Sequence, residues 1–414
     1  MDYNYETVKD LTSRFGSPLY VVDGKKFKQT FNHLEQAMRT FYPHYRIAYS
    51  VKTNYMPYLC SLIHDCGGMA EVVSSVEYDL VRRMGFSAAD IIFNGPFKRD
   101  ALKKALLEGA TVVVDNSVES AEILKVASDC PEALLHVGLR LNFDIGTEKA
   151  SRFGFDVTSE ELNDVIEGFY TVPNVAIDGI HCHFTGARDL QRWSSRVAFM
   201  LEFAQTHFDG KLRFIDLGSG MYGEMEPEFS HLFGSSLPSF EDYAAVVARA
   251  FADVYASVPD ELRPVLITEP GTTIVANAID SVAQVIGIKV IRGKTFIVLD
   301  TSYHVLGELS RVKNLPLQVL SSGHCASNDM VEDAAFVGYT CLEYDIVYRG
   351  YCGPIAIGDF VVFGNVGSYS MNMKPPFIYP GCAAVAYDDR SCEAFVVKRR
   401  ETMDDFFATY RFDF

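Results

Sequence analysis

Eight short apolar runs, separated by segments of helical spacing, lie between residues 45 and 270 of this 414-residue chain. The runs cover residues 47–51, 69–73, 91–93, 111–114, 135–141, 177–183, 214–217 and 265–268. Strands that alternate with helices form parallel βα units. Eight such units in one stretch predict a (β/α)8 TIM barrel, whose chemistry lies at the C-terminal ends of its strands.

The pattern changes after Pro270. Residues 282–290, 295–298, 360–363, 383–386 and 394–397 are β-like, with few helical stretches between them. They predict a second domain, an antiparallel β-barrel or sandwich, so that the fold class is α/β + β. Residues 18–22 are also expected to form a strand, which on pattern alone could belong to either domain.

Composition narrows the class of protein. Apolar content of 48% and charged content of 22% are typical of a soluble globular protein. The net charge of -17 argues against nucleic acid or an anionic membrane as a partner. No run of about 18 apolar residues is present, and the acidic N-terminus lacks the order of a signal peptide. The nine cysteines show no metal-ligand spacing, so we expect reduced thiols, no metal and a cytoplasmic location.

Lys52 follows the first barrel run. A lysine at the mouth of a buried strand is costly to desolvate unless it is paired or covalently engaged. Such a lysine can lose its proton and attack a carbonyl group. We expect Thr53 and Asn54 to open a helix behind it. An ordinary surface lysine is the alternative when Lys52 is taken alone.

Two later strand ends favour a cofactor over that alternative. Gly218-Ser219-Gly220 is a tight turn whose backbone N–H groups can approach a phosphate, and late barrel loops commonly bind phosphate. Glu269, before Pro270-Gly271, could accept a hydrogen bond from a protonated pyridine nitrogen. Taken singly, each is also compatible with a plain turn and a solvated glutamate.

His181 and His183 flank Cys182 in the sixth run. We expect the two imidazoles to face opposite sides, so that they cannot both bind one metal. One ring packs between barrel and helices, while that of His183 stacks on an aromatic cofactor. Cys341, taken alone, is expected to be an inert core thiol, and Tyr369 places a hydroxyl on a loop.

The order of these residues carries a family resemblance. Residues 15–20 (FGSPLY) are similar to a "GTPLY" motif, residues 49–54 (YSVKTN) to "YAxKAN" and residues 71–77 (EVVSSVE) to "DVxSxGE". The histidine pair, the glycine loop, Glu269, Cys341 and Gly367-Ser368-Tyr369 follow in the same order. Over nearly its whole length the chain resembles the fold-type III pyridoxal-phosphate decarboxylases, the group of diaminopimelate and ornithine decarboxylases.

This resemblance implies an amino-acid decarboxylase, a carboxy-lyase, that uses pyridoxal 5'-phosphate. It implies a cofactor-binding barrel over residues 26–270, and a β domain over 1–25 and 271–414 that completes the active site across a head-to-tail homodimer. The resemblance implies that Lys52 holds the cofactor covalently, that Glu269 binds its pyridine nitrogen and that His183 stacks on its ring. The residues implied to bind its phosphate are Gly218, Ser219, Gly220 and Tyr369. Cys341 of the partner subunit is implied to reprotonate Cα.

Departures from the family motifs bear on the substrate. An acidic residue follows the family's cysteine, but Leu342 stands here, with Glu343 next to it. The family's "EPGR" arginine is replaced by Thr272. Arg188 is a candidate anion contact, or else lies on a helix face. The segment Cys341-Leu342-Glu343-Tyr344-Asp345 is also similar to the "CLAGD" of carboxynorspermidine decarboxylases.

Because both charge partners are missing, we expect an extended or conjugated amino acid as substrate rather than meso-diaminopimelate. A racemase of the same fold is one alternative, although it needs a second base opposite the lysine. A catalytically silent regulatory binding protein is another, although the retention of Lys52, Glu269 and the glycine loop argues against it.

Overall fold

The structure is a computed structural model that describes residues 1, 3–146, 150–321, 330–375, 377–388, 390–391 and 393–413. It divides the chain into two compact units. The barrel unit comprises Lys28–Gly223 and Leu237–Thr273, and the β unit comprises Met1–Phe27, Glu224–Ser236 and Ile274–Phe414. The domain boundaries implied by the family stay a prediction. The seven described cysteines are free, and Cys325 and Cys392 lie outside the described residues.

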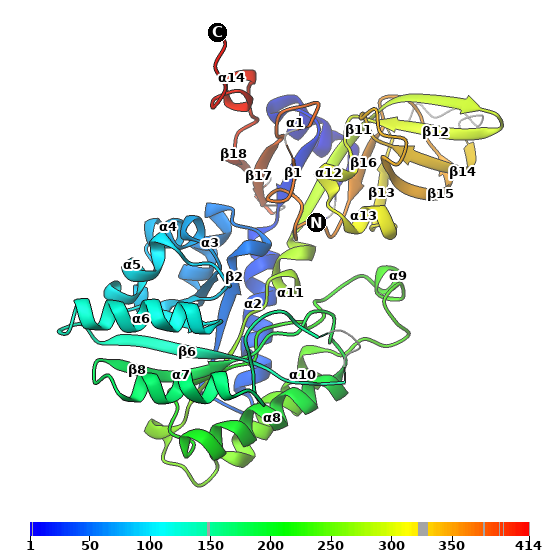
Figure 1. The fold of residues 1–414 in the computed structure, drawn as a ribbon. Helices are drawn as coiled ribbons and strands as arrows, with labels where there is room; N and C mark the ends of the chain where they lie inside the picture. The colour runs from blue at the N-terminus through cyan, green and yellow to red at the C-terminus, as the bar shows by residue number, and fades with distance from the viewer. Residues whose placement is uncertain are drawn as a thin grey trace. The chain divides into compact units, whose positions relative to one another are not determined.

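Parallel strands close a barrel in the barrel unit (Figure 1). In chain order they are β2 (Tyr45–Ser50), β3 (Met69–Val72), β4 (Ile91–Phe93), β5 (Thr111–Val114), β6 (Leu135–Asn142), β8 (Val175–His181), β9 (Phe214–Asp216) and β10 (Val265–Thr268). Neighbours in this order pair with one another, and β10 pairs with β2 to complete the ring. These eight strands, counted in the described part of the chain, confirm the predicted TIM barrel.

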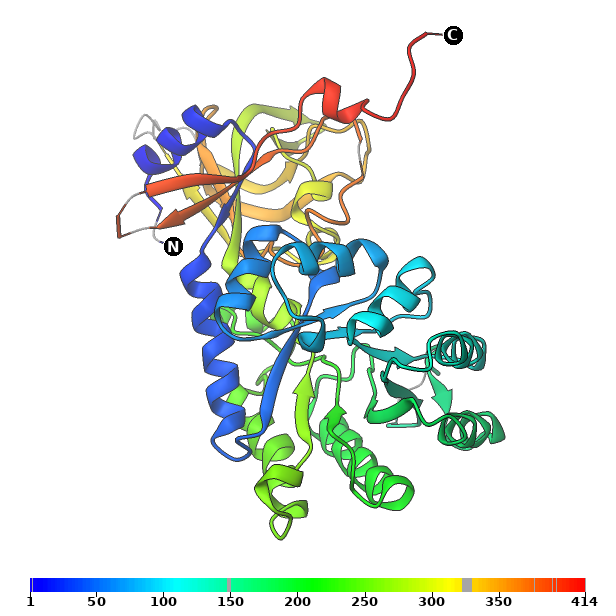
Figure 2. The same cartoon turned by 90° about the vertical axis from the view of Figure 1, so that its left-hand side faces the viewer.

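Helices lie outside the strands that they connect, as the turned view shows (Figure 2). They are α3 (Pro57–Asp65), α4 (Ser75–Arg83), α5 (Asp100–Glu108), α6 (Ser117–Asp129), α7 (Glu160–Tyr170), α8 (Leu190–Phe208) and α10 (Phe240–Val254); the short elements are η1 (Val51–Thr53), η2 (Ala88–Asp90), β7 (Phe155–Asp156) and η3 (Asp260–Leu262). Polar residues after the strands also cap helices, because the side chains of Ser74 and Asn116 accept the first free N–H groups of α4 and α6. Two helices cross the division between the units, α2 (Gly24–Arg39) and α11 (Thr272–Val275).

The β unit is built on one mostly antiparallel sheet. Its strands are β1 (Leu19–Val22), β11 (Ile279–Ile291), β12 (Lys294–Leu299), β13 (Leu317–Leu320), β14 (Met330–Val337), β15 (Ile346–Pro354), β16 (Phe360–Phe363), β17 (Ala383–Asp388) and β18 (Glu393–Lys398). β1 pairs with β11 and β17, which places the early strand in this sheet. Short helices complete the unit: α1 (Tyr5–Phe15), α9 (Pro227–Ser230), η4 (Ala276–Ala278), α12 (Tyr303–Leu306), α13 (Leu309–Val312) and α14 (Met403–Phe406).

Membrane-spanning helices were also considered. Among the helices in the described part of the chain, none combines the length and the hydropathy that a bilayer crossing requires.

Candidate active site

Lys52 lies in the single 3-10 turn η1, directly after β2. Its Nζ lies 2.5 Å from Oε2 of Glu71, a fully buried carboxylate on β3. The same oxygen accepts a hydrogen bond from the Ser50 hydroxyl at 2.6 Å. The expected helix at residues 53–54 was wrong, because Asn54 is extended and α3 begins only at Pro57, a residue suited to the first helical turn. The amine is therefore presented from a short turn.

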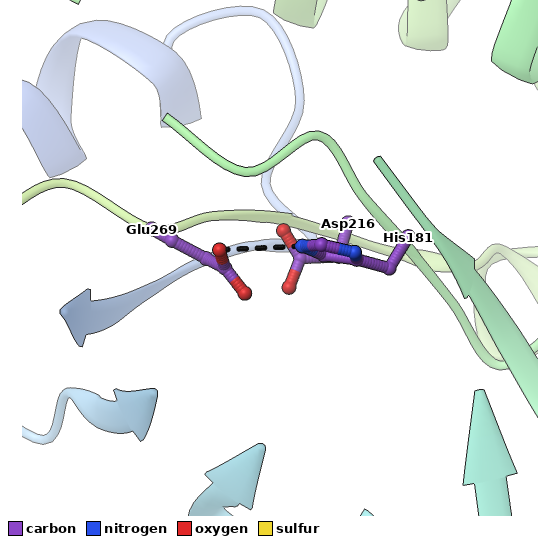
Figure 3. Close-up of side chains that lie close together, drawn as sticks. All are labelled: His181, Asp216 and Glu269. Carbon is purple, nitrogen blue, oxygen red and sulfur yellow. Dashed lines mark hydrogen bonds and ion pairs between the residues drawn. The ribbon is translucent and has the colours of Figure 1, made fainter. Parts of the chain in front are cut away.

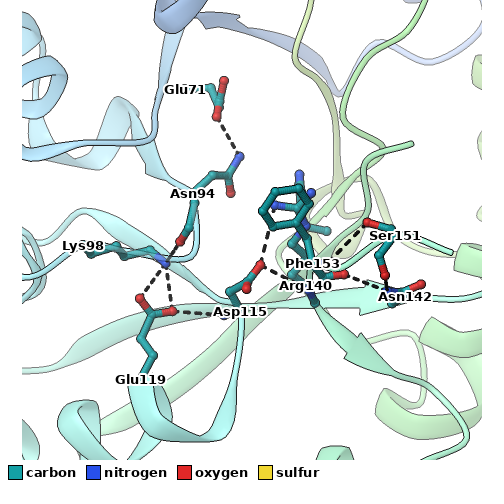
Figure 4. Close-up of polar contacts among 12 residues, drawn as sticks. Glu71, Asn94, Lys98, Asp115, Glu119, Arg140, Asn142, Ser151 and Phe153 are labelled. Carbon is teal, nitrogen blue, oxygen red and sulfur yellow. Dashed lines mark hydrogen bonds and ion pairs between the residues drawn. The ribbon is translucent and has the colours of Figure 1, made fainter. Parts of the chain in front are cut away.

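Asn94, directly after β4, joins two carboxylates at the strand ends. Its Nδ2 donates to Glu71 Oε1 at 3.2 Å and to Glu269 Oε1 at 2.5 Å. Figure 4 shows Asn94 beneath Glu71. Lys52, Glu71, Asn94 and Glu269 thus form one hydrogen-bonded chain across neighbouring strands. Sequence analysis gave Asn94 and Glu71 no role, although Asn94 directly follows a predicted strand and Glu71 lies within one.

Glu269 belongs to a buried acidic cluster with His181 and Asp216 (Figure 3). His181 Nε2 lies 3.3 Å from Glu269 Oε2. Burial acts to raise the pKa of Glu269, but the charge and hydrogen bond of His181 outweigh it and hold that pKa well below the usual range. Burial and the charge of Glu269 raise the pKa of Asp216 well above its usual range. Glu269 is therefore the ionised member of the pair and Asp216 the protonated one.

These three side chains also have a spacing that a cation could bridge. One potential ligand atom from each lies within 4.8 Å of the others, and in the searched residues no second such group was found. The sequence-based expectation of no metal stays a prediction.

His183 lies past the end of β8, beside the glycine loop. Its Nδ1 accepts a hydrogen bond from the Ser219 backbone N–H at 3.3 Å. Burial lowers the pKa of His183 to about 3, so the ring is neutral near pH 7. The expectation that the two histidines face opposite sides was wrong, since both imidazoles lie close enough to feel the charge of Glu269. Residues two apart in a strand share a face.

The glycine loop at residues 218–220 requires its glycines. Gly218 has φ +61°, and a Cβ there would lie 2.5 Å from the Cys182 carbonyl oxygen. Gly220 has φ +119°. The Gly218 N–H donates to Asp216 Oδ1 at 2.8 Å, whereas that of Gly220 has no partner within the described part of the chain. Only a residue without a side chain allows this close, left-handed path.

A second charged layer lies at the ends of β4, β5 and β6 (Figure 4). Lys98 is fully buried, and its Nζ lies 2.7 and 2.8 Å from the two Glu119 oxygens. Arg140 lies 3.6 Å from the Asp115 carboxylate. Sequence analysis missed Lys98, Glu119 and Arg140, although all three lie on or just beyond a predicted strand.

Two candidates of the barrel unit remain, Arg188 and Thr272. Arg188 donates to the Met221 carbonyl at 3.3 Å and lies over the Tyr222 ring. Thr272 is half-buried at the start of α11. Their contact with substrate stays a prediction.

Cys341, Leu342 and Glu343 lie on a turn of the β unit. Buried Asp345 holds this turn by accepting hydrogen bonds from the Thr340 hydroxyl at 2.6 Å and from the Tyr303 N–H at 2.9 Å. Cys341 is exposed, not the buried core thiol expected of an isolated cysteine. Tyr369, with φ +53°, is also exposed. These residues belong to the other unit, so their part in the site stays a prediction.

Comparison with known proteins identifies the family of this chain. Residues 27–276 match the model of the pyridoxal binding domain of pyridoxal-dependent decarboxylases. The diaminopimelate decarboxylase of Aquifex aeolicus is 25% identical over 96% of this chain and 92% of its own. The L-glutamyl-[BtrI acyl-carrier protein] decarboxylase of Niallia circulans is 24% identical over 99% and 97%. The crystal structure of the Methanocaldococcus jannaschii diaminopimelate decarboxylase has a TM-score of 0.84 at 21% identity, over 97% of this chain and 94% of its own.

The side chains fit pyridoxal 5'-phosphate. Lys52 presents an amine at a strand end, Glu269 is an ionised carboxylate, and the His183 ring is neutral and flat. The Gly220 N–H is without a partner in the described chain, as an anion site needs. The chain belongs to the pyridoxal-dependent decarboxylases, enzymes that remove carbon dioxide from an amino acid with pyridoxal 5'-phosphate as cofactor.

Proposed function

We propose that this decarboxylase acts on the α-carboxylate of an extended or conjugated amino acid rather than on meso-diaminopimelate. The observation that carries the proposal is the loss of two charges: Leu342 follows Cys341, and Thr272 stands in the "EPGR" position. A buried charged group of the substrate that finds no partner costs about 3–5 kcal/mol. The similarity to an L-glutamyl-[acyl-carrier protein] decarboxylase supports it, because a glutamyl group joined to a carrier has one carboxylate fewer than glutamate.

The barrel residues have distinct tasks in this proposal. When bound, the cofactor supplies the electron sink that makes loss of carbon dioxide feasible. Lys52 Nζ holds the cofactor covalently, and Glu71, 2.5 Å away, accepts the proton that the amine must lose. Glu269 binds the pyridine nitrogen as an anion, while His183 packs against the ring.

The glycine loop and the β unit complete the site in this proposal. Gly218, Ser219 and Gly220 bind the phosphate, chiefly through the Gly220 N–H, and Tyr369 adds its hydroxyl. The exposed Cys341 of the partner subunit donates a proton from Sγ to Cα of the product. The active form is therefore a head-to-tail homodimer, and neither subunit carries a complete site alone.

Carbon dioxide release tests the substrate proposal. The enzyme, loaded with cofactor, is given meso-diaminopimelate, ornithine, lysine, and glutamate or diamino acids conjugated through the side chain. We expect release from a conjugate at least about 100-fold faster than from meso-diaminopimelate, as one unpaired buried charge implies. The Lys52→Ala variant serves as the blank. Equal turnover of meso-diaminopimelate would contradict the proposal, and deuterium exchange at Cα without carbon dioxide release would indicate a racemase.

Mixing two inactive variants tests the homodimer. Lys52→Ala and Cys341→Ala subunits each lack one half of a shared site. Random exchange puts half of the subunits into mixed dimers with one intact site each, so about a quarter of the wild-type activity should return. No recovery, with exchange verified by labelled subunits, would place Cys341 and Lys52 in the same subunit's site. Full activity of the Cys341→Ala variant by itself would leave Cys341 without a role.

A further inference from the structure

Arg196, on α8, is completely buried behind the glycine loop. Its Nη1 donates to the carbonyl oxygens of Leu217 at 3.0 Å and Ser219 at 3.1 Å. Its Nη2 donates to the Ala187 carbonyl at 3.4 Å. A Cβ on Gly220 would lie 4.0 Å from that same Nη2. The guanidinium group is therefore packed directly against the loop.

Within the described chain no carboxylate pairs with this charge, which faces the rings of Trp193 and Phe184 at 4.1 and 5.2 Å from their centroids. Among the described residues Arg196 forms no ion pair, and its Nε has no hydrogen-bond partner. The titratable groups that act on it electrostatically, Cys182 and Tyr243, are neutral near pH 7 because burial raises the pKa of each to about 12. A buried guanidinium without a counter-anion is strongly unfavourable, and burial accordingly lowers the pKa of Arg196. This arrangement indicates that an anion binds nearby.

The backbone geometry shows on which side that anion belongs. In a trans peptide the C=O and the following N–H point in opposite directions. Because the carbonyl groups of Leu217 and Ser219 point toward Arg196, the N–H groups of Gly218 and Gly220 point away from it. Asp216 accepts the first, whereas the second has no partner among the described residues. The outer side of the loop thus presents an available donor over a buried positive charge.

We propose that Arg196 is the counter-charge of the cofactor's phosphate group, acting through the glycine loop without touching the phosphate. It is a positioning residue: it fixes the direction of the Gly220 N–H and supplies positive potential that water does not screen. The inference rests on the proposed role of the loop. Because Arg196 lies on a helix, it was not among the residues that the ends of the predicted strands identified.

The test compares the affinities of the full-length protein for pyridoxal 5'-phosphate and for pyridoxal, which lacks the phosphate, after removal of bound cofactor. Absorbance and fluorescence titration report both, so no turnover is needed. Arg196→Gln keeps a donor for the loop carbonyls but removes the charge, whereas Arg196→Lys keeps the charge. Arg192→Met is the matched control, since Arg192 lies on the same helix, partly exposed and paired with Asp189 at 2.6 Å.

We expect Arg196→Gln to weaken binding of pyridoxal 5'-phosphate about 100-fold and that of pyridoxal less than about threefold. Arg196→Lys and Arg192→Met should retain most of the wild-type preference for the phosphate-bearing compound. An equal loss for both compounds in Arg196→Gln, or no loss, would overturn the inference.

Two further outcomes are decisive. If Arg196→Gln does not fold, a 100-fold loss of the preference in folded Arg196→Lys would also overturn the inference, because the charge is still present. If the wild type itself shows no preference for the phosphate-bearing compound, the loop does not bind phosphate. That result would remove the proposed site and the inference with it, whereas the substrate proposal would stand or fall with carbon dioxide release.

Discussion

In the barrel unit the side chains of Lys52, Glu71 and Glu269 are tied together by Asn94 at the ends of paired strands. In the β unit, Cys341 and Glu343 lie on an exposed turn. Among the described residues, the side-chain hydrogen bonds of this turn converge on Asp345 and Thr340 rather than on those two. Buried, hydrogen-bonded groups such as Glu71 and Glu269 tolerate few replacements, because each replacement leaves a partner unsatisfied. Side chains on an exposed turn can change at little cost. On the proposed roles, we therefore expect cofactor chemistry to depend on the bonded strand ends of the barrel unit and substrate selection to depend on the exposed turn of the β unit.

Among changes in the barrel unit, we expect the Lys52→Ala substitution to have the largest effect on activity. We expect activity to fall by at least about 10⁴-fold, because the nucleophilic amine is lost. The absorbance band of the covalently held cofactor should disappear while the protein stays folded, since Lys52 is one-third exposed. Lys104→Ala, at an exposed lysine paired with Asp79, is the control and should leave both readouts unchanged. Retention of the band in Lys52→Ala would assign the covalent link to another lysine.

Glu269→Gln should lower kcat by about 10²–10³-fold, as expected when a preorganised charge facing the reacting group is removed. The amide can still bond to Asn94, but it carries no anion for a protonated pyridine nitrogen. Steady-state kinetics and the cofactor absorbance spectrum measure the effect. Glu202→Gln, on the exposed side of α8, is the matched control. A Glu269→Gln variant with wild-type kcat would contradict the role given to this carboxylate.

The pH dependence of stability should carry a contribution from His183. Its pKa falls from 6.5 to about 3 on folding, so between these values the unfolded chain binds a proton that the folded protein does not. Stability is therefore lost as pH falls from 6.5 toward 3, by at most about 1.4 kcal/mol per pH unit. Thermal unfolding of His183→Gln should show a shallower dependence between pH 6 and 4 than that of the wild type or of the exposed-residue control His231→Gln. Identical slopes would contradict a neutral His183 in the folded protein.

Sequence analysis anticipated the barrel better than the β unit, for a physical reason. Parallel strands are buried on both faces and form continuous apolar runs, and so all eight barrel runs overlap observed strands. β14 and β15 are partly exposed and contain Glu, Asp, Arg and Gly, which interrupt the apolar pattern by which a strand could be predicted. Lys52 and Glu269 were found because each directly follows a predicted apolar run.

Arg196 was missed for a different reason. Its hydrogen-bond partners are backbone carbonyl groups 9, 21 and 23 residues away, and these leave no mark in the side-chain pattern of α8. A helix with Trp193 and Met200 on its buried side gives no reason to expect a charged residue there. The folded path of the glycine loop, together with the Trp193 ring 4.1 Å from the guanidinium, explains why an arginine is tolerated.

The mildest change, Leu342→Asp, tests whether the β unit selects the substrate. It restores the acidic residue that follows the cysteine in the family motif, on a half-exposed turn where the free energy of unfolding should change by less than about 0.5 kcal/mol. We expect kcat/KM for a free diamino acid to rise by about tenfold, because a distal ammonium gains a partner, and that for the conjugate to fall. Glu343→Gln, on the same turn, tests whether residue 343 rather than residue 342 contacts the substrate. If Glu343→Gln abolishes activity on the conjugate and Leu342→Asp does not change it, Glu343 is the contact. If neither change alters the preference, the turn does not select the substrate, and selection then lies with barrel residues such as Arg188 and Thr272.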